Sequence, residues 1–152
     1  YYFRETTMKI TEVRERSSSL IQQLLEIWET SVRATHLFLS NDEIEMIKTY
    51  VPQALAEIPH LVIVENDNES PVAFMGIDGQ KLEMLFVSGE ERGNGLGKQL
   101  IQYGIETYSV NELAVNEQNP PARGFYEHMG FHVYHRTEFW VLQRAVSAGI
   151  CL

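Results

Sequence analysis

The chain has 152 residues, a formal net charge of −9 and a single cysteine, Cys151. These values predict one soluble globular domain with room for a core, and they exclude an internal disulfide framework. The acidic balance disfavours a nucleic-acid partner and favours an amine-bearing one, no apolar run is long enough to span a membrane, and the lone thiol fits a reducing cytoplasm.

The first stretch of the chain predicts a leader, a strand and a helix. Residues 1–7 resemble a leader, because a natural start is expected at Met8. Residues 9–14 alternate well enough for a first strand. Residues 17–19 are serines that offer N-cap hydroxyls to a helix, whose apolar face is spaced over residues 20–32.

A second helix is predicted to begin at Ser40, which forms a capping box with Glu43. Apolar side chains recur at helical spacing over residues 44–55, and the helix is expected to end near Pro59. Pro52 lies inside this stretch, so the sequence predicts a kink or a division there.

Three strands follow, over residues 61–64, 72–77 and 82–87. They are separated by polar turns at residues 66–69 and 78–79. Such short turns cannot hold a parallel crossover, so the three strands are predicted to form an antiparallel meander.

A glycine turn (residues 92–97, Arg-Gly-Asn-Gly-Leu-Gly) joins the third of these strands to a helix with apolar spacing from Leu96 to Ile105. A helix start carries unpaired backbone N–H groups and the positive end of the helix dipole. Glycines let several N–H groups converge and leave room for an anion. The turn therefore predicts a phosphate or pyrophosphate site, although a plain glycine-rich helix start has the same pattern, and neither the Rossmann nor the P-loop fingerprint fits.

The remaining elements continue an alternating pattern of strands and helices. Residues 112–115 are predicted to form a strand parallel to residues 82–87, through a right-handed crossover. Two prolines precede a short helix over residues 122–128, as expected at a helix start. Residues 131–137 then read as a strand, and residues 139–142 as a last one.

The glycine turn resembles the acetyl-CoA signature of the GCN5-related N-acetyltransferases, the GNAT family. That signature is Arg/Gln-x-x-Gly-x-Gly/Ala, and Arg92, Gly95 and Gly97 match it. The order of strand, glycine turn, helix and strand is similar to the family's order as well.

The family's second signature is an asparagine before a short helix that bears Phe-Tyr, followed by Gly-Phe. Asn119, the pair Phe125 and Tyr126, and the pair Gly130 and Phe131 match it. Two signatures in this order and spacing identify the chain as a member of the GNAT family.

The resemblance covers residues 8–138 and implies an α/β (α+β) GNAT acyl-CoA N-acyltransferase fold in a single domain. That fold has a mixed central sheet flanked by helices on both faces. Residues 34–39 and 116–119 look most like those of small bacterial members. Residues 139–152 depart from the strand pair that usually closes the fold, so an atypical tail is expected there.

The resemblance also implies where acetyl-CoA binds. Leu85 and Val87 would offer backbone groups to the thioester and the pantetheine arm in a V-shaped slot, although both side chains also suit the core. Asn119 would anchor the cofactor arm or the start of its helix, although a plain turn or N-cap asparagine is the alternative. The backbone amides that hold the pyrophosphate, and the lysine beside them, would come from Arg92, Gly93, Asn94, Gly95, Leu96, Gly97 and Lys98.

Tyr126 is the candidate general acid, because a phenol near the sulfur can protonate or hydrogen-bond the leaving thiolate. The alternative is a tyrosine that packs beside Phe125. The candidate general bases are Glu83 on the central strand, if that strand bulges, then His36 between the opening helices, and Glu117 as a third. A histidine satisfied by helix packing is the alternative for His36.

The implied activity is acetyl transfer from acetyl-CoA to a primary amine of a small molecule or peptide, by direct attack in a ternary complex. The alternative is a non-catalytic acyl-CoA-binding or interaction module. A nucleotide binder on another α/β fold fails because a meander precedes the glycine turn. No metal is expected, since His128, His132 and His135 lack metal spacing; a homodimer is a family tendency, and the acceptor is left open.

Overall fold

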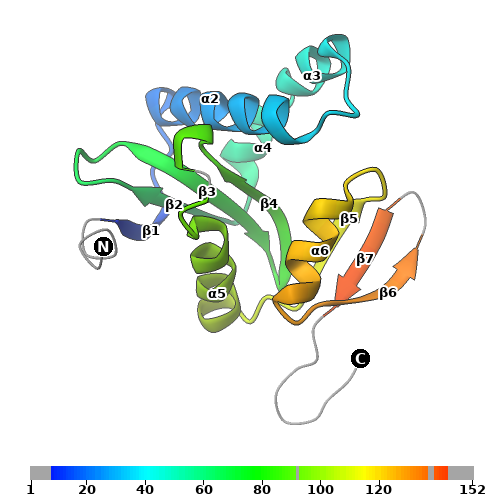
Figure 1. Ribbon diagram of the computed structural model, residues 1–152. Helices are drawn as coiled ribbons and strands as arrows, with labels where there is room; N and C mark the ends of the chain where they lie inside the picture. The colour runs from blue at the N-terminus through cyan, green and yellow to red at the C-terminus, as the bar shows by residue number, and fades with distance from the viewer. Residues whose placement is uncertain (1–7, 92, 137–138, 144–152) are drawn as a thin grey trace.

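The computed structural model of the chain describes residues 8–91, 93–136 and 139–143 (Figure 1). Its strands are β1 (Lys9–Val13), β2 (His60–Glu65), β3 (Pro71–Asp78), β4 (Lys81–Val87), β5 (Glu112–Asn116), β6 (His132–Arg136) and β7 (Phe139–Gln143). Its helices are α2 (Ser18–Thr35), α3 (Asn41–Lys48), α4 (Val51–Glu57), the short 3₁₀ helix η1 (Gly89–Glu91), α5 (Leu96–Tyr108) and α6 (Pro120–His128).

The described strands form one mixed sheet in the order β1-β2-β3-β4-β5-β7-β6. The first four strands pair antiparallel, which confirms the predicted meander. β5 pairs parallel to β4, as the crossover through α5 predicted. The predicted last strand forms as β7, which lies antiparallel between β5 and β6; residues 144–152 of the expected tail lie outside the described part of the chain.

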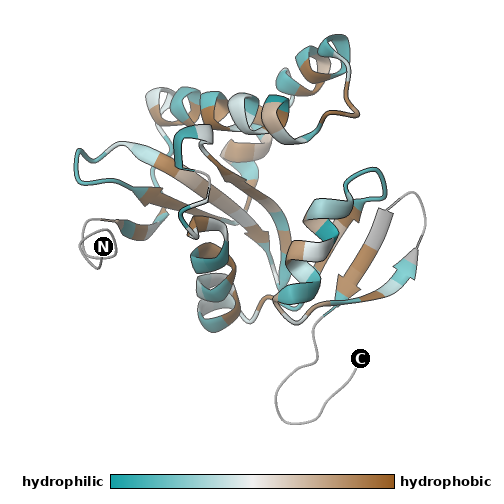
Figure 2. Ribbon diagram, viewed as in Figure 1, coloured by the Kyte–Doolittle hydropathy of each residue, from teal (hydrophilic) through white to brown (hydrophobic). Residues whose placement is uncertain are grey.

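The sheet carries an apolar layer on each face, and helices cover both. Strand residues alternate between faces, so Val62 packs toward α5 while its neighbour Leu61 packs toward α2 and α4. Leu100 of α5 and Trp28 of α2 are buried in the two opposite layers. Figure 2 shows the apolar character of the central strands between the helices. The predicted mixed sheet with helices on both faces is confirmed.

The opening helices begin where the sequence predicts. The Leu20 backbone N–H donates to Ser17 Oγ at 3.1 Å and caps α2. The capping box of α3 forms in both directions, since the Ser40 N–H donates to Glu43 Oε1 at 2.8 Å and the Glu43 N–H donates to Ser40 Oγ at 3.1 Å. Pro52 lies in the first turn of α4, so the predicted second helix is divided into α3 and α4.

β4 has a bulge at Glu83. Gly76 of β3 pairs with Met84, but the next residue, Ile77, pairs with Leu82, so Glu83 has no partner on β3. The extra residue puts Leu82 and Leu85 in the layer beneath α5 although they are three apart, while Met84 packs toward α2 and α4. The bulge therefore decides which side chains of β4 face which layer.

Candidate active site

β4 and β5 separate after a short stretch of pairing. Only Lys81 with Glu112 and Leu82 with Leu113 are paired, although β4 continues to Val87 and β5 to Asn116. A cleft of about 160 Å³ opens where the strands diverge. We call it the β4–β5 cleft; it is lined by residues 82–86, residues 113–116, His36, Asn119, Ala122 and Tyr126.

The backbone of β4 points unpaired groups toward this opening. The Ser88 N–H donates to the Val72 carbonyl at 2.8 Å. Ser88 and Val72 therefore form a hydrogen-bonded pair, and such pairs alternate with non-bonded ones along an antiparallel ladder. Phe86, two residues before Ser88, is thus also hydrogen-bonded to β3, whereas the N–H and C=O groups of Leu85 and Val87 point to the other side of β4. There β5 has already separated. The predicted backbone positions thus face the cleft side of β4, although the Val87 side chain is not part of the cleft lining.

The glycine turn leaves open space over its backbone. Gly93 and Gly95 have φ angles of 85° and 79°, in the left-handed region that favours glycine, and a Cβ added at either would meet no atom within 4 Å. Gly95 is the N-cap of α5 and has no side chain to cap it, so the first backbone N–H groups of this helix lack intrahelical partners. These features fit the pyrophosphate of acetyl-CoA. Arg92 lies outside the described residues, and the Lys98 side chain in the first turn of α5 is exposed.

The start of α5 lies beside α6, which carries the candidate acid. A Cβ on Gly97 would be 3.6 Å from the Phe125 ring. Tyr126 lines the β4–β5 cleft, and its ring packs at centroid distances of 5.0 Å from Phe125 and 6.1 Å from Phe131. Within the described part of the chain its hydroxyl has no hydrogen-bond partner. Burial raises the pKa of Tyr126 above that of an ordinary phenol, so the side chain keeps its proton at neutral pH.

His36 and Asn119, which are far apart in sequence, meet at the cleft. His36 Nε2 lies 3.5 Å from Asn119 Nδ2, and His36 Nδ1 lies 2.8 Å from Thr35 Oγ1. The Thr35 hydroxyl donates to the Ser31 carbonyl at 2.7 Å, so it accepts the proton of Nδ1 and leaves Nε2 as the acceptor. Burial lowers the pKa of His36, which favours this neutral form at pH 7. Asn119 Oδ1 also accepts from the Ala122 N–H at 3.4 Å and caps α6.

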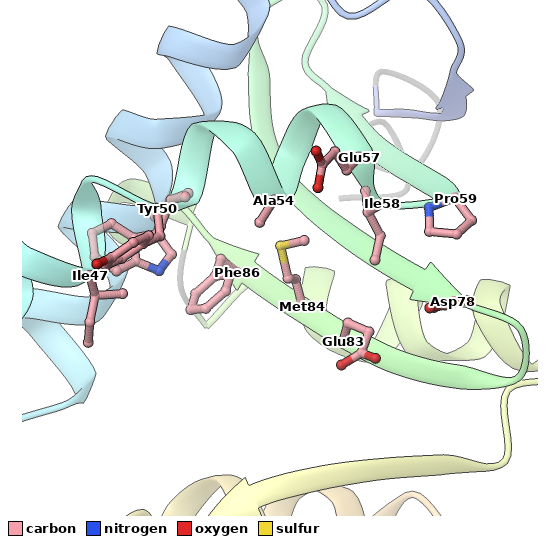
Figure 3. Close-up of a pocket in the computed structure, with 12 residues that line it drawn as sticks. Ile47, Tyr50, Ala54, Glu57, Ile58, Pro59, Asp78, Glu83, Met84 and Phe86 are labelled. Atoms are coloured by element: carbon pink, nitrogen blue, oxygen red, sulfur yellow. The ribbon is translucent and has the colours of Figure 1, made fainter.

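Glu83 lies at the boundary between the cleft and a second, larger opening. This α4 groove, of about 520 Å³, lies between β4 and the helical segment formed by α2, α3 and α4 (Figure 3). Figure 3 shows the Glu83 carboxylate on the side of β4 away from α4. Glu83, Met84 and Phe86 line both openings, so the cleft and the groove meet along β4. Lys81, which lies on the same strand, places its Nζ 3.9 Å from Oε1 of the Glu83 carboxylate.

The structure thus brings His36, Glu83, Leu85, Asn119 and Tyr126 together at one cleft. Glu117 is exposed and lines neither opening. Among the described residues no group of three His, Cys, Asp or Glu side chains is arranged to hold a metal ion. No helix in the described ranges is long and apolar enough to cross a membrane.

Met84, Phe86 and the whole α4 groove carry no sequence motif that marks them as parts of a site. The bulky side chains of residues 82–87 predicted a strand, and nothing in them signalled an open face. The helical pattern over residues 44–55 predicted only a packed face. The groove depends on how α4 lies over β4, and no short motif encodes that placement.

The chain matches a known protein family and resembles individual members of it. A family described as "Acetyltransferase (GNAT) domain" matches residues 29–140. The chain is similar to the peptidyl-lysine N-acetyltransferase YjaB of Salmonella typhimurium (strain LT2), with 40% identity over 117 residues that span 77% of this chain and 80% of that protein. This agrees with the likeness of residues 34–39 and 116–119 to small bacterial members.

Solved structures share the fold. The solution structure of the apo form of YjaB from Escherichia coli matches with a TM-score of 0.77 and 33% identity, over 89% of this chain and 94% of that one. The PaiA N-acetyltransferase from Thermoplasma acidophilum, crystallised in complex with coenzyme A, matches with a TM-score of 0.68 over 91% of this chain and 98% of that one. At 17% identity, this match shows that the two chains share a fold and nothing more.

Proposed function

Because the chain belongs to the GNAT family of acetyltransferases, we propose that it transfers the acetyl group of acetyl-CoA to the side-chain amine of a lysine in a peptide or protein. The family predicted from the glycine turn and from residues 119–131 is confirmed by the match of residues 29–140. The observation that carries the proposal is the β4–β5 cleft, because His36, Glu83 and Tyr126 all line it. A lysine acceptor is supported by the similarity to a peptidyl-lysine acetyltransferase.

Acetyl-CoA supplies a thioester: the amine attacks its carbonyl carbon, and the sulfur leaves as the thiolate of coenzyme A. The unpaired N–H groups at the start of α5, next to Gly93 and Gly95, would hold its pyrophosphate. The backbone groups of Leu85 and Val87 would hydrogen-bond the arm that lies along β4. Asn119 would fix the start of α6 and so the position of Tyr126.

Tyr126 would stabilise the leaving sulfur. Its hydroxyl has no partner within the described part of the chain, so its proton is free to be donated into the cleft. The raised pKa keeps this proton in place at neutral pH. A phenol this weakly acidic acts best by donating a strong hydrogen bond to the thiolate as charge develops.

Glu83 and His36 both remain candidates for the base that accepts the proton of the amine. Glu83 lines the cleft and the α4 groove, so an amine that enters from the groove passes its carboxylate. His36 is neutral and presents Nε2 toward Asn119 as an acceptor. Since the two openings meet along β4, both substrates can be held at once, which supports direct attack in a ternary complex.

Release of free thiol from acetyl-CoA in the presence of a lysine peptide tests this function. We expect thiol release that depends on the peptide, with mass spectrometry showing one acetyl group on its lysine. A non-catalytic acyl-CoA-binding module would bind coenzyme A in calorimetry and release no thiol with any amine. Transfer to free polyamines but to no peptide would contradict the lysine assignment. A cytoplasmic location and a homodimer stay predictions.

A further inference from the structure

The α4 groove is larger and more apolar than a single lysine side chain requires. Its volume of about 520 Å³ lies in the range of pockets that hold drug-sized ligands. Trp28 and Val51 are buried beneath it, and Met84 and Phe86 of β4 form its opposite wall. A lysine is an unbranched chain, so it fills only part of this space on its way to the β4–β5 cleft.

Apolar surface continues outside the groove. Four of the five large apolar side chains that are exposed among the described residues lie between positions 37 and 50. They are Leu37, Met46, Ile47 and Tyr50, with exposed fractions of 82%, 59%, 39% and 67%. Ile47 and Tyr50 also line the groove, as Figure 3 shows. Apolar side chains gathered on one exposed segment mark an interaction surface, and a small amine held inside the groove would leave most of them uncovered.

The charges at the groove suit a cationic ligand. Glu57, Asp78 and Glu83 are among its lining residues, and none of the described residues that line it is a lysine, arginine or histidine. An apolar wall with carboxylates at its edge matches an apolar group linked to an ammonium group. It disfavours an acidic peptide, whose charge would be repelled.

From these features, and on the basis of the proposed function, we propose that the α4 groove selects acceptor lysines that have a large apolar residue, above all an aromatic one, directly beside them in the polypeptide. The apolar neighbour occupies the space between α4 and β4. The lysine then passes Glu83 and reaches the β4–β5 cleft, because Glu83 lines both openings.

Three dye-labelled peptides that differ only beside the lysine test the proposal, with phenylalanine before it, phenylalanine after it, or glycine on both sides. KM is measured by thiol release, and Kd by fluorescence anisotropy in the presence of coenzyme A. We expect at least one phenylalanine peptide to bind about 10-fold more tightly than the glycine peptide, and its KM to fall likewise, because an aromatic side chain becomes buried. Equal KM and Kd for all three peptides would overturn the proposal.

Two variants of α4 locate the effect. Ala54 and Ala56 are both exposed, but only Ala54 lines the groove. We expect Ala54→Trp to fill the groove and bring the phenylalanine-to-glycine ratio close to one, while the matched control Ala56→Trp keeps the parental ratio. A ratio that survives in Ala54→Trp would place the preference elsewhere and overturn the proposal.

Binding and turnover separate this inference from the proposed function. A phenylalanine preference in Kd without thiol release supports the groove assignment and contradicts acetyl transfer. Thiol release without any preference supports acetyl transfer and contradicts the groove assignment. Phenethylamine, an aromatic amine that is not part of a peptide, tests whether the acceptor is a polypeptide. If it is acetylated as efficiently as the best peptide, the proposal that the acceptor is a polypeptide is overturned.

Discussion

The β4–β5 cleft offers backbone groups and a few polar side chains, whereas the α4 groove offers apolar side chains from α2, α3 and α4 and from β4. Polar and backbone binding needs particular residues at particular positions, such as glycine where φ is positive or asparagine at a helix start. Apolar binding accepts many residues of suitable size. The β4–β5 cleft therefore depends on particular residues at particular positions, whereas the adjoining α4 groove depends mainly on the size and apolar character of its side chains.

This difference has a functional counterpart. Changes in the cleft and the glycine turn are expected to alter the chemical step or coenzyme binding. Changes around the groove are expected to alter the KM of the acceptor. Four predictions test this division, in order of decreasing effect.

Replacing Tyr126 by phenylalanine removes the phenolic proton from the cleft and keeps the ring. We expect kcat to fall by about 100-fold or more, since a positioned acid contributes on that order. Calorimetry should show an unchanged Kd for coenzyme A, because the ring contacts with Phe125 and Phe131 remain. Thiol release at the parental rate would exclude Tyr126 as the acid.

The two candidate bases differ in how their loss changes the pH profile. Burial lowers the pKa of His36 below its ordinary value of 6.5, so a base at this position is neutral and active above that lowered value. If His36 is the base, kcat falls with decreasing pH through a midpoint below 6.5, and His36→Ala loses about 10- to 100-fold in kcat together with this acid-side decline.

Glu83→Gln is the matched test of the other candidate base, which lines the same cleft. If Glu83 is the base, this variant shows the loss in kcat, and His36→Ala keeps the parental profile. Parental kcat and pH dependence in both variants would mean that the amine loses its proton to water or to another group.

Gly95→Ala places a methyl group over the glycine turn, where the structure has open space. We expect the Kd for coenzyme A to rise about 10-fold, because the added group meets the anion and the backbone at φ 79° disfavours alanine. Gly79→Ala, at φ 62° in the turn between β3 and β4, is the control. It carries the same kind of backbone strain, so a thermal shift should be similar while coenzyme binding stays parental.

Arg16 holds the end of α4, one wall of the groove. Its Nη1 donates to the carbonyls of Leu55 at 2.9 Å and Ala56 at 3.1 Å, and its Nη2 donates to that of Pro59 at 3.3 Å. We expect Arg16→Ala to lower the free energy of unfolding by about 1 kcal/mol and to raise the acceptor KM about 3-fold.

The Kd for coenzyme A should be unchanged in Arg16→Ala, because the cleft does not depend on this contact. Arg14→Ala removes a nearby exposed arginine and should leave the acceptor KM at its parental value. A change confined to coenzyme binding would contradict the division between cleft and groove.

Much of the fold was predictable from local patterns. The capping box of Ser40 and Glu43, the division at Pro52 and the antiparallel meander are each set by neighbouring residues, and each is confirmed. The family was predictable because the glycine turn and the segment 119–131 need particular residue types at fixed spacing, and these can be read directly from the sequence. The roles of the site residues stay proposals that the variants above test.

By itself the sequence determined the elements, their order and the family, because capping, turn formation and helix starts depend on residues a few positions apart. Only the tertiary structure decided that a bulge puts Glu83 between the cleft and the groove, that His36 meets Asn119, and that α4 leaves a groove above β4. These arrangements arise from packing between segments distant in the chain, and many apolar sequences satisfy the same packing.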